Sequence, residues 1–153
     1  MRRFRLFLSI ISSVLIVGCD LSYYVVELVI QNESGQILFV ESNIDSFTTS
    51  GIQTLKIHNG TGGFIAQSKK YSDSAMLYLP LDSIIGNEDA YVSVYTISDS
   101  EEKHLVHTWY YSDREKDGRE LFSEKCLTQD EFHGHDGGNF LAYTFTILPE
   151  DLE

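Results

Sequence analysis

Apolar and polar side chains alternate in short runs along most of the chain from residue 23 onward. The clearest run is Ala90–Ile97 (AYVSVYTI), and the first is Tyr23–Gln31 (YYVVELVIQ), in which every second residue from Tyr24 is apolar. A period of two is that of a β-strand with one face toward a core and the other toward solvent. The pattern therefore predicts strands, and their content of β-branched and aromatic residues agrees with this.

Turn-forming residues separate the runs, as in Asn32–Gly35 and Asn59–Gly63. Thr128–Glu131 is the one helix-start pattern, but a glycine-rich stretch follows it, so it indicates at most a single turn. Short strands joined in this way predict an all-β fold: a single antiparallel β-sandwich of immunoglobulin-like type, with a small β-barrel as the alternative. The segments predicted as strands are Tyr23–Gln31, Ile37–Val40, Gly51–His58, Phe64–Tyr71, Ala75–Leu79, Ala90–Ile97, Lys103–Ser112 and Phe140–Leu148.

The first 18 residues have a different pattern. Three arginines precede an apolar run from residue 6 to residue 17, which is shorter than the roughly 20 residues of a transmembrane helix and is typical of a secretory signal peptide. The run ends in Ile16–Cys19 (IVGC), which resembles the lipobox of bacterial lipoproteins, where the chain is cut before a cysteine whose sulfur carries a diacylglyceryl group. The alternative is an ordinary secretory signal or signal anchor that a cysteine follows by chance.

The lipobox resemblance implies a cleaved signal peptide at residues 1–18, a lipidated Cys19 with a short tether at 19–22, and a β-sandwich domain at 23–153. Several acyl chains of the palmitate type on one cysteine would anchor the domain stably in a membrane, whereas a single chain binds only marginally. We therefore expect a bacterial cell-envelope protein held by its lipid, on either the periplasmic face or the cell surface.

The segment after the signal would be strongly acidic. Three of the 11 basic residues lie in the signal and all 23 acidic residues lie after it, which leaves 8 against 23 and a formal charge of −15. Such a charge repels phosphate backbones and argues against a nucleic-acid partner. With Cys19 lipidated, Cys126 is the only other cysteine, so no intramolecular disulfide is expected.

One acidic loop has the spacing of a calcium site. Asp113, Glu115, Asp117 and Glu124 occupy positions 1, 3, 5 and 12 of a twelve-residue loop with Gly118 at position 6, as in an EF-hand. However, position 3 is usually Asp or Asn, and a strand instead of a helix is predicted before the loop. The alternative is a charged hairpin tip in an acidic protein.

A second candidate is a transition-metal chelate. His133, His135 and Asp136 place two imidazoles and a carboxylate within four residues, so they could hold an ion such as Zn²⁺ with a further ligand from elsewhere. A solvated loop is the alternative, because this spacing lacks the longer intervals that fix a metal geometry.

A third candidate is aromatic. Trp109, Tyr110 and Tyr111 are consecutive and could form a platform for a sugar or a protein partner. Packing in the core and at its rim is the alternative for aromatic residues in a β protein.

The lipobox, the segment QNESGQILFVES at 31–42 and the ending YTFTILPEDL at 143–152 together resemble the small uncharacterised lipoproteins common in Bacteroidetes. The resemblance brings no activity that could be transferred residue by residue. Two triplets, 73–75 (DSA) and 82–84 (DSI), look like the O-glycosylation acceptor of that phylum. The acidic run that there accompanies surface export is missing after Cys19.

Motifs of enzymes are absent from the sequence. It contains no GxSxG, no HExxH and no P-loop, and paired carboxylates carry no weight in so acidic a chain. We therefore expect a non-enzymatic interaction or accessory module without a cofactor, anchored to the membrane through Cys19, with a protein or glycan partner. The alternative function is a calcium- or glycan-binding module, and a hydrolase is less favoured.

Overall fold

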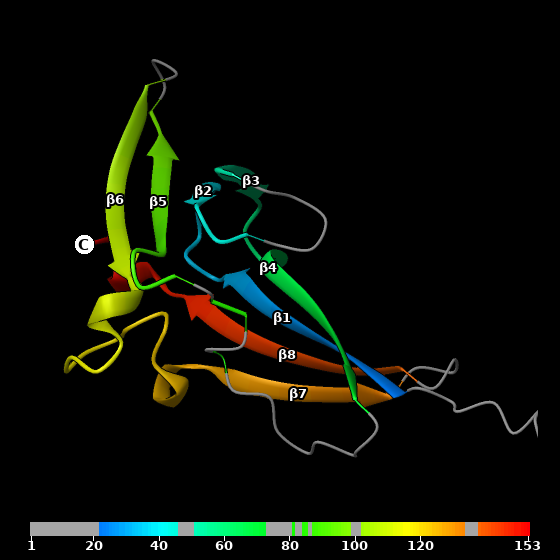
Figure 1. Cartoon of the computed structure of the whole chain (residues 1–153). Helices are drawn as coiled ribbons and strands as arrows, with labels where there is room; N and C mark the ends of the chain where they lie inside the picture. Colours follow the sequence, from blue (N-terminus) through cyan, green and yellow to red (C-terminus); the bar gives the residue numbers. More distant parts are fainter. Residues whose placement is uncertain are drawn as a thin grey trace, which may run out of the picture.

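The computed structural model describes residues 22–45, 51–72, 81, 84, 85, 87–98, 102–133 and 138–153. Over these residues the chain is all β, as predicted, with short 3₁₀ turns and no α-helix. The strands (Figure 1) are β1 (Ser22–Asn32), β2 (Leu38–Ser42), β3 (Gln53–Ile57), β4 (Thr61–Ser72), β5 (Tyr91–Ile97), β6 (Lys103–Tyr110), β7 (Thr128–His133) and β8 (Gly138–Ile147). The 3₁₀ turns are η2 (Tyr111–Asp113), η3 (Glu124–Cys126) and η4 (Pro149–Leu152).

The strands form two four-stranded sheets. Sheet A has the order β4-β1-β8-β7, and sheet B has the order β3-β2-β5-β6. Neighbouring strands are antiparallel except β1 and β8, which run parallel. The sheets do not close on one another in the part of the chain that the structure describes, so the β-sandwich prediction is confirmed and the barrel alternative is wrong.

Several strands differ from the sequence prediction in their bounds, and β4 begins at Thr61, within the predicted turn Asn59–Gly63. β6 ends at Tyr110, two residues before the predicted end, because the chain turns into η2 at Tyr111. Thr128–His133 forms β7, where the sequence indicated at most a helical turn; its antiparallel pairing with β8 supplies hydrogen-bond partners that the local pattern does not reveal. The predicted strand Ala75–Leu79 lies outside the described residues.

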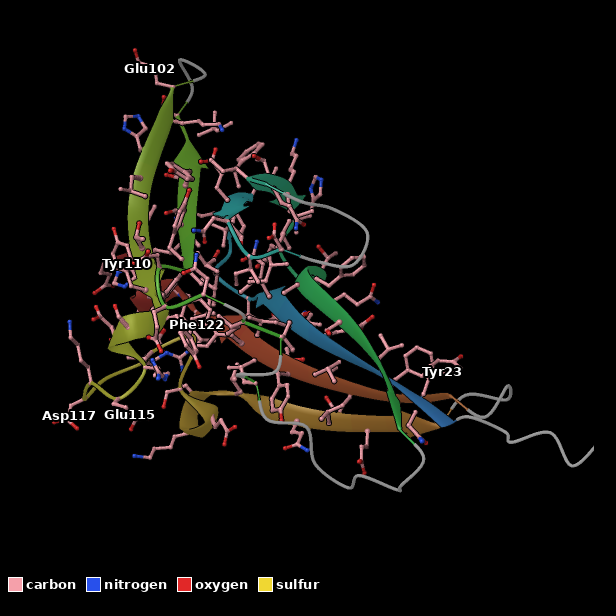
Figure 2. The ribbon with its side chains drawn as sticks, in the orientation of Figure 1. Tyr23, Glu102, Tyr110, Glu115, Asp117 and Phe122 are labelled. Atoms are coloured by element: carbon pink, nitrogen blue, oxygen red, sulfur yellow. The ribbon has the colours of Figure 1, made fainter. Side chains whose placement is uncertain are left out.

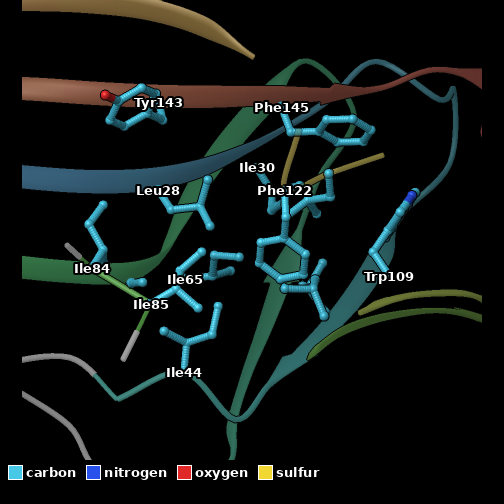
Figure 3. Packing of buried hydrophobic residues seen from close by; sticks show 14 of the residues in the cluster. Leu28, Ile30, Ile44, Ile65, Ile84, Ile85, Trp109, Phe122, Tyr143 and Phe145 are labelled. Atoms are coloured by element: carbon cyan, nitrogen blue, oxygen red, sulfur yellow. The ribbon is translucent and has the colours of Figure 1, made fainter. Parts of the chain in front are cut away.

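One hydrophobic core lies between the sheets (Figure 3). In β8, buried residues alternate with half-buried ones, and Tyr143 and Phe145 are among the largest side chains of the core. Phe145 meets Trp109 of β6 edge to face, with ring centroids 5.3 Å apart. Because β8 belongs to sheet A and β6 to sheet B, this aromatic pair joins the two layers.

A buried asparagine also joins the sheets. Asn32, the last residue of β1, is 0% exposed. Its Nδ2 donates to the carbonyl oxygens of Gln36 (2.8 Å) and Ile57 (3.0 Å), and its Oδ1 accepts from the amide nitrogen (3.0 Å) and Oγ (2.7 Å) of Ser34. Both N–H groups and both oxygen lone pairs of the Asn32 side-chain amide thereby have hydrogen-bond partners. Since Ile57 ends β3, this side chain fixes an edge strand of sheet B to sheet A.

The sandwich has a covered corner between β3 and β4, and a loop with buried residues lies on its other side. A Cβ at Gly63 of β4 would lie 3.5 Å from Cδ1 of Ile57 and 3.6 Å from Cδ1 of Leu55, so β3 and β4 pack closely although they belong to different sheets. On the other side, β6 and β7 run in different directions: in Figure 1, β6 is vertical and β7 is horizontal. The loop 111–127 connects these two strands.

Arg119 joins this loop to the C-terminal turn η4. Its Nε donates to Oδ1 of Asp151 (2.8 Å), and its Nη2 donates to Oδ2 of Asp151 (3.0 Å) and to the carbonyl oxygen of Thr146 (2.6 Å). The hydrogen bond with Asp151 raises the pKa of Arg119 above its ordinary value, against the opposing effect of burial. The guanidinium therefore stays charged at every pH at which the domain is handled. Its central carbon lies 5.2 Å from the centroid of the Phe145 ring.

Replacing Arg119 with alanine is expected to lower the free energy of unfolding by about 2 kcal/mol. The variant leaves the Asp151 side chain, which is 6% exposed, without its bidentate partner. Lys116→Ala is the control, because its pair with Asp113 is largely exposed and is worth roughly 0.5 kcal/mol. Urea unfolding measures both variants, and equal losses would contradict a structural role of the Arg119 pair.

Candidate functional site

The side of sheet B that faces away from the core carries a band of apolar side chains. Phe39 lies between the buried residues Leu38 and Val40 of β2, so its ring points outward. In the strand register, Phe39 is opposite Lys56 of β3 on one side and Tyr95 of β5 on the other. Residues that are directly opposite in neighbouring strands share a face, so these three side chains form a row across the sheet.

The row continues to the edge of the sheet. Tyr95 is opposite Leu105 of β6, and Ile97 is opposite Lys103. Two residues before Phe39, Ile37 lies on the same side. We call this surface the outer face; its members are Ile37, Phe39, Glu41, Lys56, Tyr95, Ile97, Lys103 and Leu105.

Several apolar side chains of the outer face are open to solvent. The exposed fraction is 44% for Ile37, 40% for Ile97 and 59% for Leu105. Between β2, β3 and β5 the surface is hollowed into a groove of about 380 Å³, lined by Gln36, Ile37, Phe39, Lys56 and Ile97. Adjoining exposed apolar side chains of this kind mark surfaces that bind a partner.

Two lysines lie on the outer face, and one of them, Lys56, lines the groove. Lys56 Nζ lies 5.6 Å from the Phe39 ring centroid, and Lys103 Nζ lies 5.6 Å from that of Tyr95. Lys103 Nζ is also 2.9 Å from Oε1 of Glu41. The residues of the outer face include two lysines and one carboxylate, whereas the whole chain has 23 acidic and 11 basic residues. This surface suits an apolar partner segment that carries a carboxylate.

The three consecutive aromatics divide between the core and the surface. Trp109 is 2% exposed and its Nε1 donates to the carbonyl oxygen of Arg119 (3.0 Å), and Tyr111 is 4% exposed. Tyr110 alone is open to solvent, at 49%, beside Tyr91 with ring centroids 6.5 Å apart. The exposed three-ring platform predicted from the sequence is therefore not formed, because two of the rings belong to the core.

Of the acidic residues predicted to bind calcium, Asp113 ends η2, Glu124 begins η3, and Glu115 and Asp117 lie between these turns. Asp113 Oδ1 is paired with Lys116 Nζ at 2.8 Å, and Glu115 and Asp117 lie at the tip of the loop (Figure 2). Across the described ranges, no group of three or more His, Cys, Asp or Glu side chains is arranged to hold a metal ion. The structure thus does not bring Asp113, Glu115, Asp117 and Glu124 together as one ligand set.

A cavity of about 400 Å³ lies beside this loop. Its lining includes the carboxylates of Glu115 and Glu124 but also the cationic side chains of Arg114 and Lys125. The Arg114 guanidinium carbon is 4.1 Å from the Tyr111 ring centroid, which fixes this cation at the cavity. Positive groups in the wall oppose the binding of a divalent cation.

The other predicted site residues fall mostly outside the described part of the chain. His133 ends β7, but its side chain is not described, and His135 and Asp136 lie in the undescribed segment 134–137. The lipobox with Cys19 and the serines of both glycosylation triplets also lie outside it. The metal chelate, the lipidation and the glycosylation stay predictions.

Similarity to known proteins adds no constraint on these sites. No protein-family model, curated protein or solved structure matches this chain. None of the described segments is a helix with the length and apolar character needed to cross a membrane. The outer face is therefore argued from its geometry alone.

Sequence reasoning missed the outer face, although β5 contains a signal. Val92 and Val94 are buried, and Tyr95 and Ile97 lie at outward positions of the same strand. A strand with one solvated face normally carries polar residues at those positions. Large apolar side chains on both faces of Ala90–Ile97 were the available indication of a second apolar surface.

Proposed function

We propose that the protein is a lipid-anchored, non-enzymatic interaction module of the bacterial cell envelope that binds a partner protein through the outer face. The observation that carries the proposal is the row Phe39, Tyr95 and Leu105 with its neighbours Ile37 and Ile97, several of them exposed beside a groove. An apolar centre with a polar rim is the usual composition of a protein interface.

The envelope location is supported by the basic and apolar N-terminus and by the lipobox pattern Ile16–Cys19. β1 begins at Ser22, so the chain between Cys19 and the sandwich spans at most about 11 Å. The formal charge of −15 on residues 19–153 disfavours contact of the domain with anionic lipid head groups. The lipid on Cys19 would therefore provide the attachment to the membrane. A module held in this way stays close to the membrane and to other envelope proteins.

Site-specific photocrosslinking tests the proposal. A photoreactive phenylalanine analogue at Leu105 or at Ile97 is expected to give a discrete adduct of the same mass when intact cells are irradiated. Phe64 on sheet A, which is 51% exposed, and Ile52, which is 69% exposed, are matched control positions. Adducts of equal yield at the controls, or none at Leu105 and Ile97, would overturn the outer face as the binding surface.

The lipid anchor is tested separately in the same cells. The Cys19→Ser variant lacks the acyl acceptor and is expected in the soluble fraction after lysis, while the wild-type protein sediments with membranes. Retention of the variant in the membrane fraction would contradict attachment through Cys19.

A further inference from the structure

The four edge strands differ in what lies along them. β3 and β4 pack against one another at the covered corner, where Gly63 lies close to Leu55 and Ile57. β7 carries Asp130 and Glu131 at adjacent exposed positions, so a carboxylate lies on each side of the strand. Charged residues at an edge disfavour the addition of a further strand. β6 carries Lys103 and a bulge, but none of its residues is a carboxylate, and its place in sheet B gives it no packed partner like that of β3 and β4.

The edge strand β6 contains no acidic residue, and the C-terminal turn η4 lies close to part of it. It is eight residues long (KHLVHTWY), and among the described strands it pairs only with β5. Lys103, His104, Leu105 and His107 are exposed. A strand of this length with unpaired backbone groups along one side is a template for strand addition.

A bulge in β6 fixes which side chains an added strand would meet. The register shifts by one residue at Val106, so Leu105 lies opposite Tyr95 and Lys103 lies opposite Ile97. Both β6 side chains therefore belong to the outer face, next to the free edge. An added strand would place alternate residues beside Leu105 and Lys103, at the end of the apolar row.

We infer that the free edge of β6 binds an extended segment of the partner protein as a fifth strand of sheet B, with an apolar side chain beside Leu105 and a carboxylate beside Lys103. The inference rests on the proposed function and specifies its binding mode. The side chain of Lys103 is 46% exposed and its ammonium has three donors, so it serves a second carboxylate in addition to Glu41. Leu105 loses its 59% exposure under the added side chain.

The charge of the chain favours a foreign segment over a second copy at this edge. A second copy of residues 19–153 would bring another formal charge of −15, and its repulsion grows with the product of the two charges. A segment with one or two carboxylates meets Lys103 and Lys56 locally without that cost. The recognition pattern is an acidic residue two positions from an apolar one.

Peptide selection against the full-length protein in detergent micelles tests this binding mode. A displayed library of random peptides of about twelve residues is expected to yield sequences with Asp or Glu two positions from Leu, Ile, Val or Phe. The variant Leu105→Lys is expected to bind the selected peptides with an affinity lower by about tenfold or more. The matched control Phe64→Lys is expected to bind them with unchanged affinity. Bound peptide is expected to slow amide hydrogen exchange in residues 103–107.

Each other outcome has a definite meaning. Peptides that bind the outer face without slowing exchange in β6 overturn strand addition but leave the proposed function standing. Absence of crosslinks at Leu105 and Ile97 in cells overturns the proposed function itself. If the protein sediments as a dimer that Leu105→Lys dissociates, the edge belongs to a second copy and the inference is overturned.

Discussion

Replacing Phe145 with alanine is expected to lower the free energy of unfolding by about 4 kcal/mol. Phe145 is 0% exposed, and its ring packs against Trp109 at a centroid distance of 5.3 Å. Its removal opens a cavity between the sheets and also takes away the surface beneath the Arg119 guanidinium, which lies 5.2 Å from the ring centroid. Denaturant unfolding, followed by the fluorescence of the single tryptophan, measures the loss.

The control for this prediction is Phe64→Ala. Phe64 is 51% exposed on β4, so its truncation is expected to cost at most about 1 kcal/mol. Phe145→Leu refills much of the volume and is expected to lie between the two. Similar losses for Phe145→Ala and Phe64→Ala would contradict a core that is centred on the contact between the sheets.

Replacing Asn32 with alanine is expected to lower the free energy of unfolding by about 3 kcal/mol. The variant removes the hydrogen bonds to the carbonyl oxygens of Gln36 and Ile57 and leaves the amide and hydroxyl of Ser34 without their acceptor. Asn32→Asp is expected to be as damaging, because a second carboxyl oxygen would replace the Nδ2 donor opposite those two carbonyl oxygens. Thermal and urea unfolding measure both variants.

Asn59→Ala serves as the matched control for Asn32. Oδ1 of Asn59 accepts a hydrogen bond from the amide of Gly35 at 2.7 Å, but this contact is exposed. Water replaces such a bond, so the expected cost is below about 1 kcal/mol. An Asn32→Ala loss no larger than this would show that the buried amide is not needed to join the sheets.

Both residues bear on the outer face although neither belongs to it. Phe145 contacts Trp109 of β6, and Asn32 is hydrogen-bonded to the end of β3. These are the two edge strands of sheet B, so contacts from sheet A fix both sides of the surface. A binding surface on a fixed sheet loses little conformational entropy when a partner docks.

The class of fold could be predicted from the pattern of residues alone. Alternation of period two, β-branched and aromatic composition and the turns at Asn32–Gly35 and Asn59–Gly63 act locally, so they can be read from neighbouring residues. They predicted strands close to the observed β1, β5 and β8 and a two-sheet architecture. The lipobox pattern is equally local, and from it comes the expected attachment at Cys19.

Which strands pair, and which face of each strand is open, depends on contacts between segments that are distant in the sequence. The parallel pairing of β1 with β8 joins the two ends of the chain, and β7 is a strand because β8 lies beside it. Alternation shows that a strand has two faces, but a second sheet must be in place to decide which one is covered. For that reason Trp109 lies in the core, whereas Tyr95 and Leu105 lie on the outer face.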